Sequence, residues 1–253
     1  MFNIAFNTFK ELTRNKILYL ILFFAILLIF FSIALASLSL WQTEKITLDF
    51  WLSMIEIFWL VSVIFIGSQL IFKEIEWKTI YLILSKPISR FEFILWKFIG
   101  FAMILACIVF FQAAIFLLVL KYSWSQLDTL IIFSIIFIYL KLAVLFAVIL
   151  FFSTFISSIM SIILTILVYI IAHWITSIID MAISTKNGLL EKIWWTIYYV
   201  FPNFESLNIK NLIGSSIAIW PEYLLLNSLY AILYCFMILV FTVVIFNRKT
   251  FES

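Results

Sequence analysis

The longest uncharged stretch of the chain sets the strongest limit on its fold. Between Lys141 and Asp180 lie 38 residues that carry no formal charge. A single helix of that length would measure about 57 Å, nearly twice the bilayer hydrocarbon core of about 30 Å. We therefore expect two membrane-spanning helices here. They would be joined by a turn between Ser153 and Ser158, where hydroxyl groups can satisfy the backbone groups that a turn leaves unpaired.

The composition extends this expectation to the whole chain. Of its 253 residues, 66% are hydrophobic and 11% are charged, whereas soluble domains typically carry about 45–50% apolar and about 25% charged residues. Four glycines and three prolines, beside 30 phenylalanines, leave little turn chemistry and favour a small number of long helices. The predicted fold class is an all-α polytopic membrane protein, and a soluble domain, a disordered chain and a β-rich fold are excluded.

Six segments are long and apolar enough to cross a bilayer as helices of about 20 residues. They cover residues 17–38, 50–72, 96–120, 130–150, 157–178 and 223–246. Before them, apolar residues recur at steps of three and four from Phe2 to Leu12. This pattern predicts an amphipathic helix over residues 1–15 that lies flat in the membrane interface, with a frayed polar leader as the alternative. Residues 1–253 would then form a single transmembrane domain.

Lysine and arginine are unevenly distributed between the connections. Ten lie at the two termini and between the second and third spans, and five lie in the other connections. Because cytoplasmic segments carry the excess of positive residues, both termini are predicted to be cytoplasmic, in a multi-pass protein of the cell membrane. The connection 180–222 would then lie outside, and its many Trp and Tyr residues favour short helices that dip into the membrane between spans five and six.

The cytoplasmic connection between spans two and three, residues 73–95, is the most highly charged. Eight of the 29 charged residues fall between Lys73 and Lys97. Pro87 cannot continue a helix, and Ser89 and Glu92 stand at the spacing of a capping box, so a new helix is predicted to begin at residue 90 and run into the third span. Two helices joined by a sharp turn would suit contact with a partner, although a basic hairpin that only fixes topology is an equal alternative.

The same connection carries a family resemblance. The pattern E-x-E-x-x-T-I-x-x-x-L-S-K-P-x-S-R-x-E-F-x-x-x-K resembles the first cytoplasmic loop of type-2 ABC exporter permeases, although Trp96 stands where glycine is common. In that family the loop contains the coupling helix, which sits in a cleft of the ATP-binding subunit. The implied ATPase-docking residues are Glu74, Glu76, Lys78, Thr79, Leu84, Ser85, Lys86, Pro87, Ser89, Arg90 and Glu92. Residues 199–204 and 246–249 are also similar to permeases of multicopper-enzyme maturation systems.

The resemblance implies a permease subunit that works with partner chains. The sequence contains no G-x-x-x-x-G-K-[ST] phosphate-binding loop, so this chain is expected to be no enzyme and to bind no cofactor. ATP and Mg would be held by a separate ATP-binding subunit, present in two copies, and a second permease subunit would complete the transporter in the lipid bilayer. No nucleic acid partner is expected. Ser157, Ser161 and Thr165 form a small-xxx-small ladder that suits a dimer interface, with internal packing as the alternative.

Two charged residues fall inside predicted spans. Placing a charge at the centre of a bilayer costs about 2.5–3.5 kcal/mol on insertion scales. Glu56 and Lys141 are therefore expected to face protein or water, either paired with each other or lining a translocation path. An alternative function is a proton-coupled secondary carrier that uses Glu56, Lys141 and His173. The inverted repeats and helices broken by Gly or Pro that typify such carriers are not evident.

Other polar residues in the spans favour structural roles. His173 and Asp180 lie on nearly one helical face, but a metal site needs three or four ligands, so no metal site is predicted. Gln69 and Gln112 are predicted to form hydrogen bonds between helices.

Overall fold

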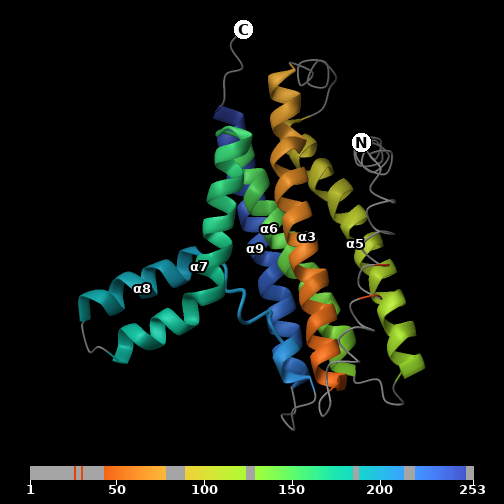
Figure 1. The fold of residues 1–253 in the computed structure, drawn as a ribbon. Helices are drawn as coiled ribbons and strands as arrows, with labels where there is room; N and C mark the ends of the chain where they lie inside the picture. The colour runs from red at the N-terminus through yellow and green to blue at the C-terminus, as the bar shows by residue number, and fades with distance from the viewer. Residues whose placement is uncertain are drawn as a thin grey trace.

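The computed structural model describes residues 43–77, 89–123, 129–184, 188–213 and 220–248, together with Ile26 and Phe30. These residues form the helices α3 (Thr43–Glu76), α5 (Arg90–Ser123), α6 (Thr129–Ser153), α7 (Ser158–Ser184), α8 (Gly188–Val200) and α9 (Pro221–Arg248), and the 3₁₀ turn η1 (Lys210–Leu212) (Figure 1). No strand occurs in this part of the chain. The predicted all-α class is therefore confirmed for the described residues.

Five of these helices are long and apolar enough to cross a membrane by length and composition. They are Leu48–Glu76 within α3, Arg90–Leu118 within α5, and the whole of α6, α7 and α9. A membrane-embedded helical protein is thus supported. The predicted first span, residues 17–38, and the predicted interfacial helix, residues 1–15, lie outside the described residues apart from Ile26 and Phe30. The total of six spans stays a prediction.

Helix α6 is the centre of the bundle. It packs against α3 and α9 and also contacts α5 and α7 (Figure 1). In its apolar stretch 72% of the residues are buried, compared with 22% in α7 and 28% in α9. Buried residues run without a break from Lys141 to Leu150 of α6, as expected of an apolar helix at the centre of a bundle, whereas Ile132 and Ile136 near its start are exposed.

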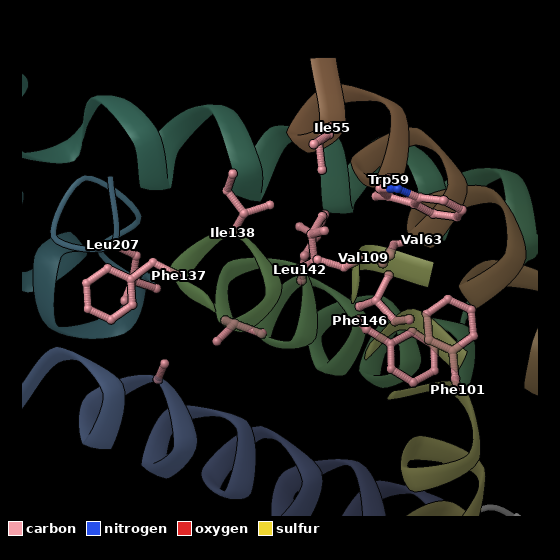
Figure 2. Close-up of a cluster of buried hydrophobic side chains, with 14 of the residues drawn as sticks. Ile55, Trp59, Val63, Phe101, Val109, Phe137, Ile138, Leu142, Phe146 and Leu207 are labelled. Atoms are coloured by element: carbon pink, nitrogen blue, oxygen red, sulfur yellow. The ribbon is translucent and has the colours of Figure 1, made fainter. Parts of the chain in front are cut away.

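Large side chains and one close helix contact hold this centre together. Figure 2 shows Phe101 of α5 beside Phe146 of α6, and the two rings stack with their centroids 4.0 Å apart. On α3, a Cβ atom added at Gly67 would lie 2.6 Å from Cγ2 of the buried Ile149. The approach of α3 to α6 therefore depends on the absence of a side chain at residue 67.

A tight turn joins α6 to α7 within the segment where the uncharged stretch was expected to reverse. Helix α6 ends at Ser153 and α7 begins at Ser158. The hydroxyl groups of Ser153 and Thr154 each donate to a backbone carbonyl three residues earlier, at 2.9 and 2.7 Å. The Ser158 hydroxyl donates to that of Ser68 on α3 at 3.0 Å. The side chains thus satisfy polar groups at a turn between apolar helices.

Beyond this bundle, the end of α7 and the whole of α8 form a hairpin that projects to one side (Figure 1). Helix α7 continues to Ser184, past the end predicted at residue 178. The chain then returns to the bundle through residues 201–213, which we call the returning segment. Its Phe204 and Leu207 are buried, and Leu207 lies beside Phe137 of α6 (Figure 2). The returning segment is therefore part of the core.

Candidate functional site

A cluster of charged side chains is buried where α3, α6 and the returning segment meet. Glu56 and Lys141 each expose only 2% of their side chains. The Lys141 ammonium lies 2.7 Å from Oε1 of Glu56, and the Lys210 ammonium lies 2.9 Å from Oε2. Of the two arrangements considered for Glu56 and Lys141, the structure shows the ion pair, within a cluster of three charges rather than two.

Two contacts of this cluster are not apparent from the sequence. Lys210, which also donates to the Ser53 hydroxyl at 3.3 Å, is 154 residues from Glu56 in the chain. The Tyr169 hydroxyl of α7 donates to Oε1 of Glu56 at 3.4 Å. In the sequence, Lys210 is one of several positive residues in a long connection. Its position beside the apolar residue Ile209, which is buried, is the signal that could have marked it.

This arrangement serves as a clamp between distant parts of the chain. One carboxylate accepts hydrogen bonds from two ammonium groups, so α3, α6 and η1 are joined at a single residue. Removing charges from water costs several kcal/mol per ion, and this cost is offset only when partners and hydrogen bonds are well placed. The geometry of Glu56 meets that condition on both oxygens.

His173 is placed differently from the other two residues of the carrier hypothesis. Its Nε2 lies 3.9 Å from the Glu205 carboxylate, and its ring stacks on Tyr169 with centroids 5.6 Å apart. No described hydrogen bond joins His173 to Glu56 or Lys141. The three residues named for a proton relay therefore do not form one hydrogen-bonded chain among the described residues.

The remaining polar residues of the spans show mixed outcomes. Trp59 of α3 donates its indole N–H to the side-chain oxygen of Gln112 on α5, so the helix-to-helix hydrogen bond predicted for Gln112 is confirmed. Gln69 is exposed on α3. Among the described residues, no three His, Cys, Asp or Glu side chains gather as a metal site would require.

Two of the three residues predicted for a dimer interface, Ser161 and Thr165 of α7, pack within the chain. Ser161 and Thr165 are fully buried within the chain, and their hydroxyl groups donate to carbonyls of their own helix at 3.0 and 2.7 Å. Only Ser157 is exposed. The small side chains let α7 pack inside the chain, so Ser161 and Thr165 offer no surface to a second subunit.

The start of α5 has the capping geometry expected from the sequence. The backbone N–H of Ser89 donates to the Glu92 carboxylate at 3.0 Å, and the backbone N–H of Glu92 donates to the Ser89 hydroxyl at 3.2 Å. Helix α5 begins at Arg90. This reciprocal pair is a capping box, so the predicted helix start is confirmed.

Three helix ends are tied together beside this cap. Glu74 near the end of α3 forms an ion pair with Lys97 of α5. The Arg90 guanidinium donates to the carbonyl oxygens of Phe246 and Asn247, at 2.8 and 3.2 Å, where α9 leaves its last carbonyls without partners in the helix. A cation at this end also interacts favourably with the helix dipole. These contacts define a region that we call the tied helix end. It consists of Glu74, Arg90, Lys97 and the last residues of α9.

The predicted docking residues therefore divide into groups. Glu74 and Arg90 make contacts within the chain, and Ser89 and Glu92 cap α5. Glu76 is exposed, and the neighbouring Trp77 exposes 68% of its surface. The other predicted docking residues lie outside the described part of the chain, namely Lys78, Thr79, Leu84, Ser85, Lys86 and Pro87.

Comparison with known protein families shows the family to which the chain belongs. A family described as "Protein of unknown function (DUF2705)" matches residues 36–251. The chain belongs to this family. The match includes both the buried charge cluster and the tied helix end, and the family description states no activity. No curated protein matches the sequence.

Proposed function

We propose that this member of the DUF2705 family is the transmembrane permease subunit of an ATP-driven type-2 ABC transporter, acting as an exporter. It would couple to a separate ATP-binding subunit through residues 73–97. The observation that carries this proposal is the tied helix end, which joins α3, α5 and α9 on both sides of the segment that resembles a coupling helix. A ligand site within the bundle would not need such a connection at the helix ends.

The tied helix end supports a mechanical role. A push on the segment between Trp77 and Ser89 acts first on α3 and α5. The Glu74–Lys97 ion pair keeps these two helices together, and Arg90 passes the displacement to α9. Because α3 and α9 both pack on α6, motion of the tied helix end would re-pack the central helix. An ATP-binding subunit that changes its own dimer contacts could drive this motion, with both chain termini on its side of the membrane.

The proposal assigns the rest of the transporter to other chains. The sequence has no phosphate-binding loop, so two copies of the ATP-binding subunit would bind ATP and Mg. A second permease subunit would complete the translocation path. Because Ser161 and Thr165 are buried within the chain, the interface with this second subunit would be formed by other residues.

Co-purification tests the proposal. The chain is expressed with an ATP-binding protein from a neighbouring reading frame, as wild type, as Glu76→Lys and as Glu222→Lys. Glu76 is exposed beside the tied helix end, whereas Glu222 is exposed at the start of α9, so the two charge reversals form a matched pair. We expect Glu76→Lys to lose the partner and Glu222→Lys to retain it, because misplaced charge at a complementary interface opposes association.

Equal recovery of the partner with all three chains would contradict docking at this end. Transport that continues without any ATP-binding subunit would instead favour the proton-coupled carrier. Arg90 is also among the predicted docking residues, but its contacts with α9 make it unsuitable as a test position, since its loss would also disturb the bundle.

A further inference from the structure

An open pocket lies between α8, the returning segment and α9. Its volume is about 490 Å³, within the range of about 300–1,000 Å³ that is usual for small-molecule sites. Its lining combines four tyrosines, two asparagines and a serine with Leu226 and Met237. None of these side chains carries a formal charge at neutral pH. The pocket is separate from both the buried charge cluster and the tied helix end.

Hydrogen bonds from α9 fix one wall of this pocket. The Tyr234 hydroxyl donates to the carbonyl oxygen of Val200 at 2.9 Å, and the Tyr230 hydroxyl oxygen accepts the backbone N–H of Asn203 at 2.9 Å. The Asn203 side-chain oxygen in turn accepts two backbone N–H groups of the returning segment, each at 3.1 Å. The pocket is therefore a built feature of the fold, because its wall is bonded to α9.

Some hydrogen-bonding groups of the pocket have no partner among the residues that the structure describes. The hydroxyl oxygens of Tyr198 and Tyr230 accept N–H groups of Asn203, and no described residue accepts the protons of these two hydroxyls. Asn227 donates to the carbonyl of Tyr223 at 2.9 Å, and no described residue donates to its side-chain oxygen. The lining thus offers donors and an acceptor to a ligand, and leaving them unpaired in apolar surroundings is costly.

If α9 crosses the bilayer, as its length and composition allow, the pocket lies at membrane depth whichever end of α9 faces the cytoplasm. Leu226 and Met237 stand 5 and 16 residues after Pro221, so they lie about 8 and about 24 Å along the helix, inside a core of about 30 Å. Both are exposed, at 61% and 40%. A ligand can therefore enter from the lipid and lay an acyl chain along these two side chains.

Because the lining carries no charge, it favours some amphiphiles over others. A phosphate or an ammonium group at this depth would need an opposite charge, and the lining has none. Hydroxyl and ester oxygens need only hydrogen bonds, which Tyr198, Tyr230 and Asn227 can supply. We propose that this pocket binds an uncharged amphiphile whose head carries hydroxyl or ester oxygens, the chemistry of a diacylglycerol. This binding does not depend on coupling to an ATP-binding subunit.

Photolabelling of the full chain in lipid nanodiscs tests the pocket. The probe is a diacylglycerol with a diazirine in one acyl chain, added without any partner subunit. Leu226→Trp fills the pocket, whereas Leu229→Trp places the same bulk on α9 at an exposed residue outside the lining. We expect labelling of residues 198–206 and 226–237 to fall about tenfold in Leu226→Trp and to be unchanged in Leu229→Trp.

Two further measurements distinguish binding in this pocket from non-specific contact with lipid. Unlabelled diacylglycerol should compete with the probe better than phosphatidylglycerol or phosphatidylcholine. Tyr198→Phe keeps the ring and removes one hydroxyl, so it should weaken labelling. It should lower the unfolding temperature only slightly, because that hydroxyl accepts a single long hydrogen bond of 3.4 Å from Asn203. This variant tests the pocket even if Leu226→Trp does not fold. Equal labelling of the two tryptophan variants, or equal competition by the charged lipids, would overturn the proposal.

Discussion

The bundle has two groups of charged side chains with the same chemistry in different surroundings. In the buried charge cluster, Glu56 and Lys141 each expose 2% of their side chains, and Lys210 exposes 19%. In the tied helix end, Glu74 exposes 18% and Lys97 exposes 6%, and exposed residues such as Glu76 lie close by. The two carboxylates differ most, because Glu56 is desolvated and must stay paired, whereas Glu74 is partly exposed beside residues that a partner can reach.

This difference assigns separate tasks to the two groups. The buried charge cluster joins α3, α6 and η1, and it has no accessible charge on Glu56 or Lys141 to offer another protein. The tied helix end joins α3, α5 and α9 beside side chains that a partner can reach. We infer that the first group sets the stability of the bundle and that the second transmits motion.

The largest effect is expected from breaking the buried charge cluster. Glu56→Leu would leave Lys141 buried without its carboxylate and would also remove the partner of Lys210. Loss of one member of a buried ion pair costs about 3–5 kcal/mol, so thermal unfolding of the detergent-solubilised chain should shift strongly downward. Adding Lys141→Met should recover part of the loss. An unfolding temperature unchanged by Glu56→Leu would contradict the proposal that the buried charge cluster stabilises the bundle.

A smaller effect is expected at the closest contact between α3 and α6. Gly67→Ala would place a methyl group against Ile149, and overpacking of this kind costs about 1–3 kcal/mol. Gly188→Ala is the matched control, since a Cβ at that position meets nothing within 4 Å. The two melting curves should separate clearly. Equal curves would show that the close helix approach contributes nothing to the buried centre.

The cap at the start of α5 should contribute less. Ser89→Ala removes the hydroxyl that accepts the Glu92 N–H, and loss of such a cap costs about 0.5–2 kcal/mol. Ser89→Asp, which keeps an acceptor, should restore most of the stability in the same unfolding assay. Failure of aspartate to rescue while alanine destabilises would mean that the cap acts through something other than this hydrogen bond.

The smallest effect on stability is expected at Glu76. This side chain is exposed, and surface substitutions usually change stability by less than about 0.5 kcal/mol. Glu76→Lys should therefore melt like the wild type even where it loses the ATP-binding partner. A large drop in its unfolding temperature would erase the distinction between the two charged groups.

Features that depend on neighbouring residues were predictable from the sequence. The capping box of Ser89 and Glu92 and the turn between Ser153 and Ser158 both follow from local chemistry. The pairing of Glu56 with Lys141 was predictable for a different reason, because an unpaired charge inside a span is expensive.

Contacts between distant segments were not predictable in the same way. Lys210 reaches Glu56 only because the returning segment enters the bundle, and Arg90 meets Phe246 across 156 residues of chain. The ladder of Ser161 and Thr165 correctly indicated a close helix contact, but small side chains do not specify which helix approaches. For Ser161 and Thr165, the alternative of packing within the chain is the one that the structure shows.

The coupling role requires the tied helix end to face the cytoplasm, and cysteine labelling can determine on which side of the membrane it lies. Cys107 and Cys235 are replaced by alanine, and a single cysteine is introduced as Trp77→Cys. A membrane-impermeant maleimide is then applied to vesicles of both orientations. The account predicts labelling in inside-out vesicles, where the cytoplasmic face is accessible, and none in right-side-out vesicles. Labelling only in right-side-out vesicles would place this end away from ATP and contradict the coupling role.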